Sequence, residues 1–459
     1  MQQETIAAIS TPPGEGGIAI IRVSGSDAIE KVQSIFKPRQ KGRLISQLKG
    51  YQMILGWIVD DMDQPIDECL LAIMRKPHSY TAEDTVEIHC HGGVLAARQC
   101  LERVLAQGIR EAFAGEFTQR AYLNGRLDAS QAEAVIEIIR ARSKKALNLA
   151  MKQLSGYNSQ YIHRLEDRLI QATALIEASI DFPEDVGEPD YDEIASLLTD
   201  VRDNLTKLLS AGKRAEIYRS GVKVVICGKP NVGKSSLLNW LSGRDRAIVT
   251  EIPGTTRDII EEYVNIKGIP VRLIDTAGIR RTQDRVEAIG VKMAQQAISE
   301  AQLAIFLLDI STGITEEDEE IFSSLNPAKT IILINKDDLL KKQIEADQIE
   351  QLFPGIPVIV GSVREEKGLS ELQDKVEAML LAGQGEPGDM EMLLSARQQQ
   401  ILQRCIEQIG PIIEMLGLIS LDCLAVEIDE VLQDMGELTG KSLKAEAMER
   451  IFRDFCIGK

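Results

Sequence analysis

A glycine-rich run that could bind phosphate reads GKPNVGKS over residues 228–235. It follows an apolar run at 222–227 and precedes a helix-forming segment at 236–241, which is the strand, loop and helix setting of the G-x-x-x-x-G-K-[ST] motif. The glycines of such a loop let backbone N–H groups cradle phosphate oxygens at a helix N-terminus. Lys234 would reach the β- and γ-phosphates, and the Ser235 hydroxyl would hold Mg²⁺. The alternative is a glycine turn before a surface helix, which the next two motifs disfavour.

Two further motifs each follow an apolar run that is typical of a buried strand. The run DTAG begins at Asp275, and the run NKDD begins at Asn335. Asp275 could hold Mg²⁺ through water, and the Gly278 N–H could meet the γ-phosphate. The Asp338 carboxylate could accept two N–H bonds from guanine, which adenine does not offer, while the stem of Lys336 covers the base. Since ligands bind at the carboxyl ends of strands in open α/β sheets, the three motifs predict a guanine-nucleotide domain.

The residues that would carry out hydrolysis depart from the Ras-like pattern. The loop TEIPGTTRD at 250–258 contains threonines that could join the phosphate-loop serine on Mg²⁺ and sense the γ-phosphate, although it could also be a polar hairpin loop. Ras-like enzymes place a water-orienting glutamine where this chain has Ile279. Fast hydrolysis would therefore need another polar group, and Glu287 and Arg280 are the nearby candidates. Asn231 offers a side-chain oxygen suited to a monovalent cation that could supply the missing positive charge.

Length, charge and cysteine content limit the class of protein. A chain of 459 residues should form two to four domains. It has 70 acidic and 52 basic residues, a formal net charge of −18, so any RNA contact must use local patches or a partner's surface. Seven cysteines without paired spacing indicate reduced thiols. With no signal peptide and no long apolar run, we expect a soluble, cytoplasmic protein that does not contact membranes.

The hydrophobic pattern changes along the chain and predicts a multidomain α/β protein. Residues 1–117 mix short strands with helices, which indicates an α+β domain. Residues 118–215 have helical periodicity and form the first part of a helical domain. Residues 216–383 should form a Ras-like nucleotide domain with a mostly parallel sheet. Helical periodicity resumes within 384–459, so the nucleotide domain is predicted to be an insertion into one helical domain.

Several unusual residues lie in the N-terminal part. Arg22 and Glu87 interrupt apolar strands, either as outward-facing residues of a half-exposed sheet or as part of a ligand site. The run HCH at 89–91 could suggest a metal site, but no neighbouring pattern completes four ligands. The turn at Gly92 and Gly93 accounts better for that run.

The chain ends in FCIGK. Cys456 lies four residues from the end, as in prenylation signals, but the residues after it do not fit that signal. A frayed terminus is the usual expectation. An apolar helical run leads directly into Cys456, however, and this favours a docked tail.

Taken together, these motifs resemble the MnmE family of tRNA modification GTPases, also called TrmE, over the whole chain. The nucleotide motifs are shared with many GTPases, whereas the N-terminal and C-terminal motifs are specific to this family. The matching segments are TPPG at 11–14 with Gly16 and Gly17, Glu83 and Asp84, HGG at 91–93, GEFT at 115–118 with Arg120 and Ala121, Leu127 and Asp128, DFPE at 181–184, PGTTRD at 253–258, and CIGK at 456–459.

The resemblance implies a homodimer built through N-terminal tetrahydrofolate-binding domains, and a potassium-dependent GTPase whose nucleotide domains meet during hydrolysis. It implies a heterotetramer with the FAD-dependent protein MnmG. Together they would add an aminomethyl or carboxymethylaminomethyl group at C5 of the wobble uridine of certain tRNAs. The carbon donor would be 5,10-methylene-tetrahydrofolate, for which 5-formyl-tetrahydrofolate is an analogue.

The resemblance also assigns roles to residues of this chain. K⁺ would contact Asn231, Thr250, Ile252 and Thr255, with Thr250 and Ile252 using backbone oxygens. Ser235 and Thr256 would bind Mg²⁺, Glu287 would help to position water, and Cys456 matches a cysteine important for modification. Folate contacts would come from Arg22, Glu87, Arg120 and Lys459. The expected GTP-binding residues are Asn231, Val232, Gly233, Lys234, Ser235, Ser236, Thr250, Glu251, Ile252, Pro253, Gly254, Thr255, Thr256, Asp275, Thr276, Ala277, Gly278, Asn335, Lys336, Asp338, Ser362 and Val363.

Three segments depart from the family pattern. Ala82 replaces a glycine at a tight-turn position, and Ser362-Val363-Arg364 replaces the usual S-A-[KR] of the guanine loop. The segment GKSLK at 440–444 is more basic than usual.

Two further functions compete with tRNA modification. A ribosome-assembly or regulatory GTPase would be expected to carry a basic RNA-binding appendage, and a folate enzyme regulated by GTP should turn over with its N-terminal domain alone.

Overall fold

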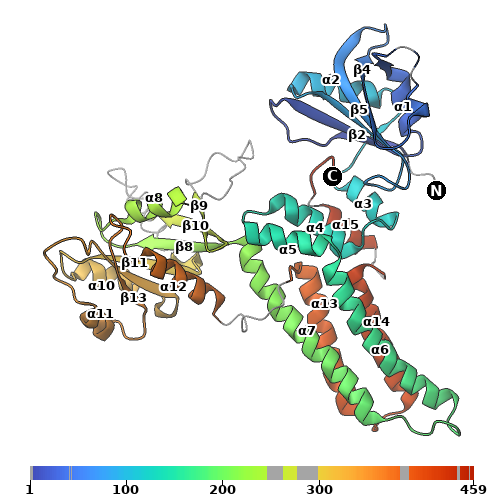
Figure 1. Cartoon of the computed structure of the whole chain (residues 1–459). Coiled ribbons are helices and arrows are strands. Elements are labelled where there is room, and N and C mark those ends of the chain that lie inside the picture. The colour runs from blue at the N-terminus through green and yellow to red at the C-terminus, as the bar shows by residue number, and fades with distance from the viewer. Residues whose placement is uncertain are drawn as a thin grey trace. The chain divides into compact units, whose positions relative to one another are not determined.

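The computed structural model describes residues 4–40, 42, 44–244, 262–275, 298–382, 392–441, 445–453 and 455–459 (Figure 1). By their internal contacts these residues form two compact units. The first consists of Met1–Ile136, Gln153–Val201 and Glu407–Lys459, and the second of Glu137–Lys152 and Arg202–Ile406. The division into domains at residues 117, 215 and 383 stays a prediction.

The first unit contains a seven-stranded sheet in the order β3-β4-β5-β6-β2-β1-β7. Neighbouring strands are antiparallel, except that β1 and β7 are parallel. The strands are β1 (Ile6–Ile9), β2 (Ile18–Ser24), β3 (Phe36–Pro38), β4 (Gln52–Val59), β5 (Pro65–Met74), β6 (Thr85–His91) and β7 (Arg110–Glu111). Together with its helices, this sheet gives residues 1–117 the predicted α+β character.

Two helices, α1 (Ala28–Ile35) and α2 (Val94–Leu105), share one hydrophobic core with this sheet. Helix α1 buries Ala28, Ile29, Val32 and Ile35, which follow the helical repeat and give it one apolar face. A short 3₁₀ helix, η1, spans Ile45–Gln47. The sheet buries alternate residues of its strands, which leaves the others free to form a site on the opposite face.

Long helices make up the rest of the first unit. Helices α6 (Tyr157–Asp181) and α14 (Leu421–Thr439) pack side by side, as Figure 1 shows. Both bury residues at helical spacing, and this apolar face explains their association. The first unit also holds α3 (Glu116–Leu123) and α15 (Ala445–Arg453). Helices α4 (Ala129–Arg140), α5 (Lys144–Leu154), α7 (Tyr191–Ser220) and α13 (Ala396–Met415) contribute residues to both units.

The second unit contains a six-stranded sheet in the order β13-β12-β11-β8-β10-β9. All neighbours are parallel except β9 and β10, so the predicted, mostly parallel sheet is confirmed. The strands are β8 (Val222–Cys227), β9 (Glu262–Ile266), β10 (Ile269–Asp275), β11 (Leu303–Asp309), β12 (Thr330–Asn335) and β13 (Val358–Val360).

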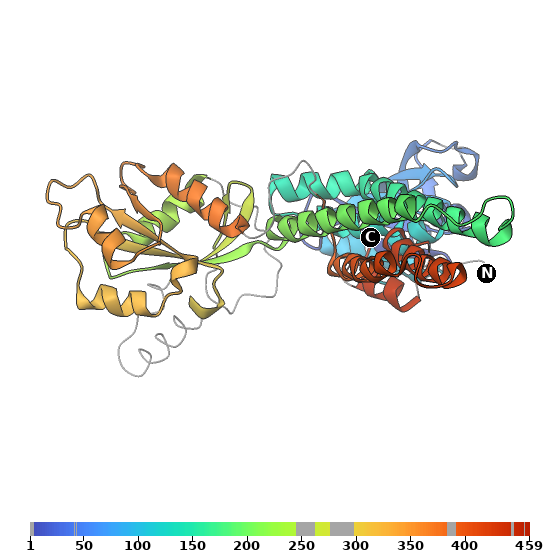
Figure 2. The same ribbon diagram turned by 90° about the horizontal axis from the view of Figure 1, so that it is seen from below.

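Helices cover both faces of this parallel sheet, which explains why every residue of β11 and β12 is buried. One core contains apolar residues of α8 (Lys234–Arg244) and α12 (Leu369–Leu381). The opposite core contains residues of α10 (Glu316–Ser323) and α11 (Ala346–Leu352). Figure 2 shows the sheet between these two layers. A 3₁₀ helix, η3, spans Pro327–Lys329 just before β12. Within the described ranges, no helix is both long and apolar enough to cross a membrane.

Candidate functional site

The phosphate loop connects the end of β8 to the start of α8, as the sequence predicts. Gly228 and Gly233 adopt positive φ angles of 139° and 109°. A Cβ atom at Gly228 would lie 2.4 Å from the Leu307 carbonyl oxygen, and one at Gly233 would lie 2.3 Å from the Asn335 side-chain nitrogen. Both positions therefore require glycine for the space as well as for the backbone angle.

Lys234 is 6% exposed and lies against the loop that it belongs to. Its ammonium donates hydrogen bonds of 2.7 Å to the Gly228 carbonyl and 2.6 Å to the Lys229 carbonyl. The next residue, Ser235, is exposed in the first turn of α8, beside the exposed Ser236. The loop thus holds the Lys234 ammonium against its own backbone carbonyls and presents the Ser235 hydroxyl at the helix N-terminus. This arrangement suits anion binding.

Asn231 and Val232 occupy opposite environments within this loop. Asn231 is exposed and has a positive φ of 64°. Val232 is buried and packs in the core beside α8. The asparagine side chain is therefore accessible, whereas the valine anchors the loop.

Asn335 connects the phosphate loop to the loop after β13. Its side-chain nitrogen donates a 2.8 Å bond to the Val232 carbonyl, and its side-chain oxygen accepts a 3.0 Å bond from the Val363 backbone N–H. Asn335 is 3% exposed, so both bonds are shielded from water. The first residue of the NKDD run therefore fixes the relative positions of two predicted binding loops.

The remaining residues of this run form a charged cluster at the same edge of the sheet. Asp338 accepts a 2.6 Å hydrogen bond from the Ser362 hydroxyl. Lys336 lies 2.5 Å from an oxygen of Asp309, the last residue of β11. Burial alone would raise the pKa of Asp309, but hydrogen bonds from Lys336 and Ser311 outweigh it and hold the pKa below its usual value. The structure thus keeps Asp309 ionised as a partner of Lys336.

Part of the predicted site lies outside the described residues. Asp275 ends β10, where its backbone pairs with Ile226 of β8, next to the phosphate loop. Asp275 is thus described, whereas other predicted site residues lie outside the described ranges. They are Thr250, Glu251, Ile252, Pro253, Gly254, Thr255, Thr256, Thr276, Ala277, Gly278, Arg280 and Glu287.

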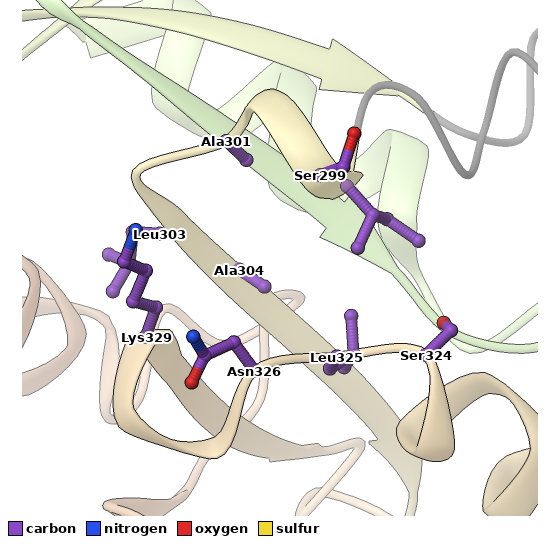
Figure 3. Close-up of a pocket in the computed structure, with 9 residues that line it drawn as sticks. Ser299, Ala301, Leu303, Ala304, Ser324, Leu325, Asn326 and Lys329 are labelled. Carbon is purple, nitrogen blue, oxygen red and sulfur yellow. The ribbon is translucent and has the colours of Figure 1, made fainter.

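A cavity of about 260 Å³ in the second unit lies away from this edge (Figure 3). Leu303 at the start of β11 and Lys329 just before β12 line it. The candidate nucleotide residues follow the carboxyl ends of these parallel strands, whereas the cavity lies at their amino ends. It therefore belongs to a different part of the domain.

A second group of predicted residues meets at the chain terminus, within the first unit. Arg22 on β2 forms a 2.9 Å ion pair with Glu87 on the neighbouring β6. The Gly458 carbonyl accepts a 3.0 Å bond from the Ser10 hydroxyl and a 3.4 Å bond from Arg22. A Cβ atom at Gly458 would lie 2.3 Å from the Ile9 carbonyl oxygen. These contacts confirm that the tail is docked.

The last residue, Lys459, lies near the Arg22–Glu87 pair. Burial, followed by the nearby Arg22 guanidinium, lowers the pKa of the Lys459 ammonium. Cys456 is exposed, and its carbonyl accepts a 3.4 Å bond from the Gly115 N–H. The tail thus brings Lys459 to the charged pair, while the Cys456 thiol, three residues earlier, stays accessible.

Arg120 lies in a buried network and is only 3% exposed. Its guanidinium lies 3.2 Å from Glu83 and donates a 2.9 Å bond to Glu116 and a 2.8 Å bond to the Glu4 carbonyl. The sequence does not predict these carboxylate partners. Only Glu116, one helical turn before Arg120, could have been found from spacing.

Two aromatic rings that the sequence pattern does not predict at this site lie near Arg22. The guanidinium carbon of Arg22 lies 5.3 Å from the centre of the Tyr80 ring and 5.6 Å from that of Phe117. Burial raises the pKa of Tyr80, so its hydroxyl stays protonated and can hydrogen-bond with Thr118. The charged pair therefore lies beside flat apolar surfaces.

The chain matches two family models, "GTP-binding protein TrmE N-terminus" over residues 5–126 and "MnmE helical domain" over residues 130–456. A tRNA modification GTPase MnmE from Syntrophomonas wolfei is 55% identical, with 99% of each chain aligned. One from Carboxydothermus hydrogenoformans is 45% identical over 100% of both. A solved structure of Era from Aquifex aeolicus bound to GDP.AlF4- is 29% identical over 41% of this chain and 66% of that chain, with a TM-score of 0.29, which is too low to indicate a common architecture. The full-length relatives and both family models agree that the chain belongs to the MnmE family of tRNA modification GTPases.

Proposed function

We propose that the chain is a potassium-dependent GTPase that, with an FAD-dependent partner, modifies C5 of the wobble uridine, position 34, of certain tRNAs. The product would be aminomethyl- or carboxymethylaminomethyluridine. The observation that carries this proposal is the full-length identity to proteins named tRNA modification GTPase MnmE.

The contacts around Lys234 support GTP and Mg²⁺ as the ligands of the second unit. On nucleotide binding, the Lys234 ammonium would exchange its two loop carbonyls for β- and γ-phosphate oxygens. Ser235 would hold Mg²⁺ with Thr256. The Ser362 hydroxyl already orients one oxygen of Asp338, so the carboxylate is prepared for the two N–H groups of guanine.

The accessible side chain of Asn231 supports potassium as the catalytic cation. Since Ile279 cannot orient water, positive charge near the phosphates would come from K⁺ held by Asn231, Thr250, Ile252 and Thr255. Glu287 would position the attacking water, with Arg280 as a further polar candidate. These residues would act together when two nucleotide domains meet.

The docked tail supports folate binding in the first unit. Glu87 can accept N–H bonds from the guanidine-like edge of a pterin, and Arg22 and Lys459 can pair with folate carboxylates or ring oxygens. Arg120 would have to exchange one of its present carboxylate partners to contact the ligand. Bound 5,10-methylene-tetrahydrofolate would supply the carbon, and the accessible Cys456 thiol would lie near it.

The net charge of −18 bears on the partners. Because the chain has no overall basic field, tRNA contact would use local patches and the surface of the MnmG partner. We propose that the chain forms a homodimer through its N-terminal domains, that two copies join MnmG as a heterotetramer, and that this complex acts in the cytoplasm.

A reconstituted reaction tests the proposal. The purified chain, the flavoprotein partner, GTP, methylene-tetrahydrofolate, unmodified tRNA and either ammonium or glycine as the nitrogen source should yield the C5-modified uridine, detected by mass spectrometry of nucleosides. Asp338→Asn should lose this product together with GTP hydrolysis. If hydrolysis is normal but no modified uridine forms in the reaction or in cells that carry the chain, the alternative of a ribosome-assembly or regulatory GTPase is favoured.

A further inference from the structure

Three buried cysteines from separate parts of the first unit meet beneath the N-terminal sheet. Cys69 lies on β5, Cys90 on β6 and Cys100 on α2. The antiparallel register pairs Leu70 with His89, so Cys69 faces Cys90 one step along the ladder. The Cys90 and Cys100 sulfur atoms lie within 4.8 Å of each other, and all three cysteines belong to one hydrophobic core. Three buried thiols are therefore close neighbours beneath the sheet.

Asp67 brings a carboxylate to the same point. One of its oxygens and the sulfur atoms of Cys90 and Cys100 all lie within 4.8 Å of one another. One carboxylate oxygen of Asp67 accepts a 2.7 Å bond from the His91 backbone N–H, and the other lies 2.6 Å from the His91 imidazole nitrogen. His91 thus fixes the orientation of Asp67, as an outer partner of a metal ligand does.

We propose that Cys69, Cys90, Cys100 and Asp67 form a structural zinc site. The spacing of Asp67, Cys90 and Cys100 suits one shared ion. Cys69 would supply the fourth ligand, because it lies opposite Cys90 in the ladder and its sulfur is 3.6 Å from the Asp67 carbonyl oxygen. Four such ligands can close around an ion in the tetrahedral geometry that Zn²⁺ prefers, and thiolate sulfur is its favoured ligand type. Each ligating thiol would release its proton to water as the metal binds. The ion would enter beside Asp67, where the exposed His91 marks the nearest surface.

This site is separate from the candidate folate site. Glu87 and Cys90 are three residues apart on β6, so their side chains point to opposite faces of the sheet. Zinc at the thiols would tie β5, β6 and α2 together beneath the Arg22–Glu87 pair. Its role would be to stabilise the sheet and to take no part in the reaction.

Simple core packing and a disulfide are the two alternatives to a metal at this cluster, and each leads to a different measurement. Buried cysteines can be small apolar core residues, in which case the chain binds no metal at this point. Two of the thiols could instead join as a disulfide, in which case non-reducing mass spectrometry would find a pair missing two hydrogens. The converging carboxylate favours a metal, because a disulfide needs no such ligand.

Metal content and Co²⁺ spectroscopy test the site on the full chain, purified without chelators. We expect about one zinc per chain by elemental mass spectrometry. Replacing it with Co²⁺ should give the visible bands of a tetrahedral ion and the near-ultraviolet charge-transfer band of thiolate ligands. Cys100→Ser should abolish both signals. His91→Ala, which removes a partner of Asp67, should weaken zinc binding about 10- to 100-fold.

Cys423→Ser is the matched control, because Cys423 is an exposed thiol on α14, and it should keep zinc and both spectral signals. If Cys100→Ser fails to fold, the Co²⁺ spectrum of the unchanged chain decides. The proposal is overturned if that spectrum lacks the thiolate band, if zinc persists in Cys100→Ser, or if two of the three cysteines form a disulfide.

Discussion

The docking of the C-terminal tail can be tested at Gly458. Its φ is +92°, and an added Cβ would lie 2.3 Å from the Ile9 carbonyl oxygen. Gly458→Ala would impose about 1–2 kcal/mol of left-handed strain on the docked state. Within the docked state, the shift that relieves this contact would also break the bonds from Ser10 and Arg22 to the Gly458 carbonyl, which costs about 1–2 kcal/mol more. The loss of about 3 kcal/mol corresponds to a roughly 100-fold fall in the ratio of docked to undocked tail.

Hydrogen exchange followed by mass spectrometry measures this ratio in the full chain. The C-terminal peptide of Gly458→Ala should lose about 100-fold in protection, since the Lys459 N–H hydrogen-bonds with the Cys456 carbonyl only in the folded tail. Gly417→Ala is the matched control. Gly417 also has a positive φ of +71°, but its nearest contact is the Tyr191 ring at 3.9 Å, so the tail should stay protected.

The functional consequence follows from the position of the tail. Gly458→Ala should keep GTP hydrolysis, because the nucleotide residues belong to the other unit, and should lose uridine modification. Equal protection of the C-terminal peptide in the two alanine variants would refute the docking argument. It would mean that the tail contacts contribute no free energy in solution.

Four further outcomes are expected. Asp338→Asn should weaken GTP binding and favour xanthine nucleotides, and unchanged GTP affinity in a titration would remove the guanine assignment. GTP hydrolysis should be faster in K⁺ than in Na⁺ at matched ionic strength, and Asn231→Ala should erase that difference while Mg²⁺·GTP still binds. Cys456→Ser should keep hydrolysis and folate binding but lose the modified uridine, and full modification would reduce the thiol to packing. For Glu116, burial alone would raise the carboxyl pKa, but hydrogen bonds from Arg110, Phe113 and Arg120 lower it. The stability that the ionised carboxylate provides should therefore be lost as pH falls below about 4, the ordinary range of glutamate. Glu116→Gln should remove this pH dependence from the free energy of unfolding.

The sequence predicts the second unit well because its signals are local. Strand β8, the glycine loop and α8 are consecutive, so their pattern needs no long-range information. Strands β11 and β12 are buried on both faces and read as continuous apolar runs, which indicates a parallel sheet. The NKDD run follows β12 directly. The predicted site at this edge of the sheet follows from these neighbours.

Contacts between distant residues are not predictable in this way. Arg120 meets Glu83 and the Glu4 carbonyl, and no spacing in the sequence relates them. The cysteine cluster shows the same limit. The run at 89–91 gave Cys90 no partners, because Cys69 and Cys100 reach it only through the register of β5 and the position of α2.

Asn335 shows that a motif can predict a binding role without predicting which atoms its side chains contact. The NKDD pattern assigns this run to base recognition, yet the Asn335 side chain bonds with the backbone on the phosphate side and on the Ser362 side. Gly233 leaves the space that this side chain fills, since a Cβ there would lie 2.3 Å from its nitrogen. A side chain at residue 233 would therefore displace the Asn335 amide from both of its bonds. The buried Asn335 amide therefore couples the phosphate loop to the loop after β13. A substitution of Asn335 should weaken base binding and phosphate binding together.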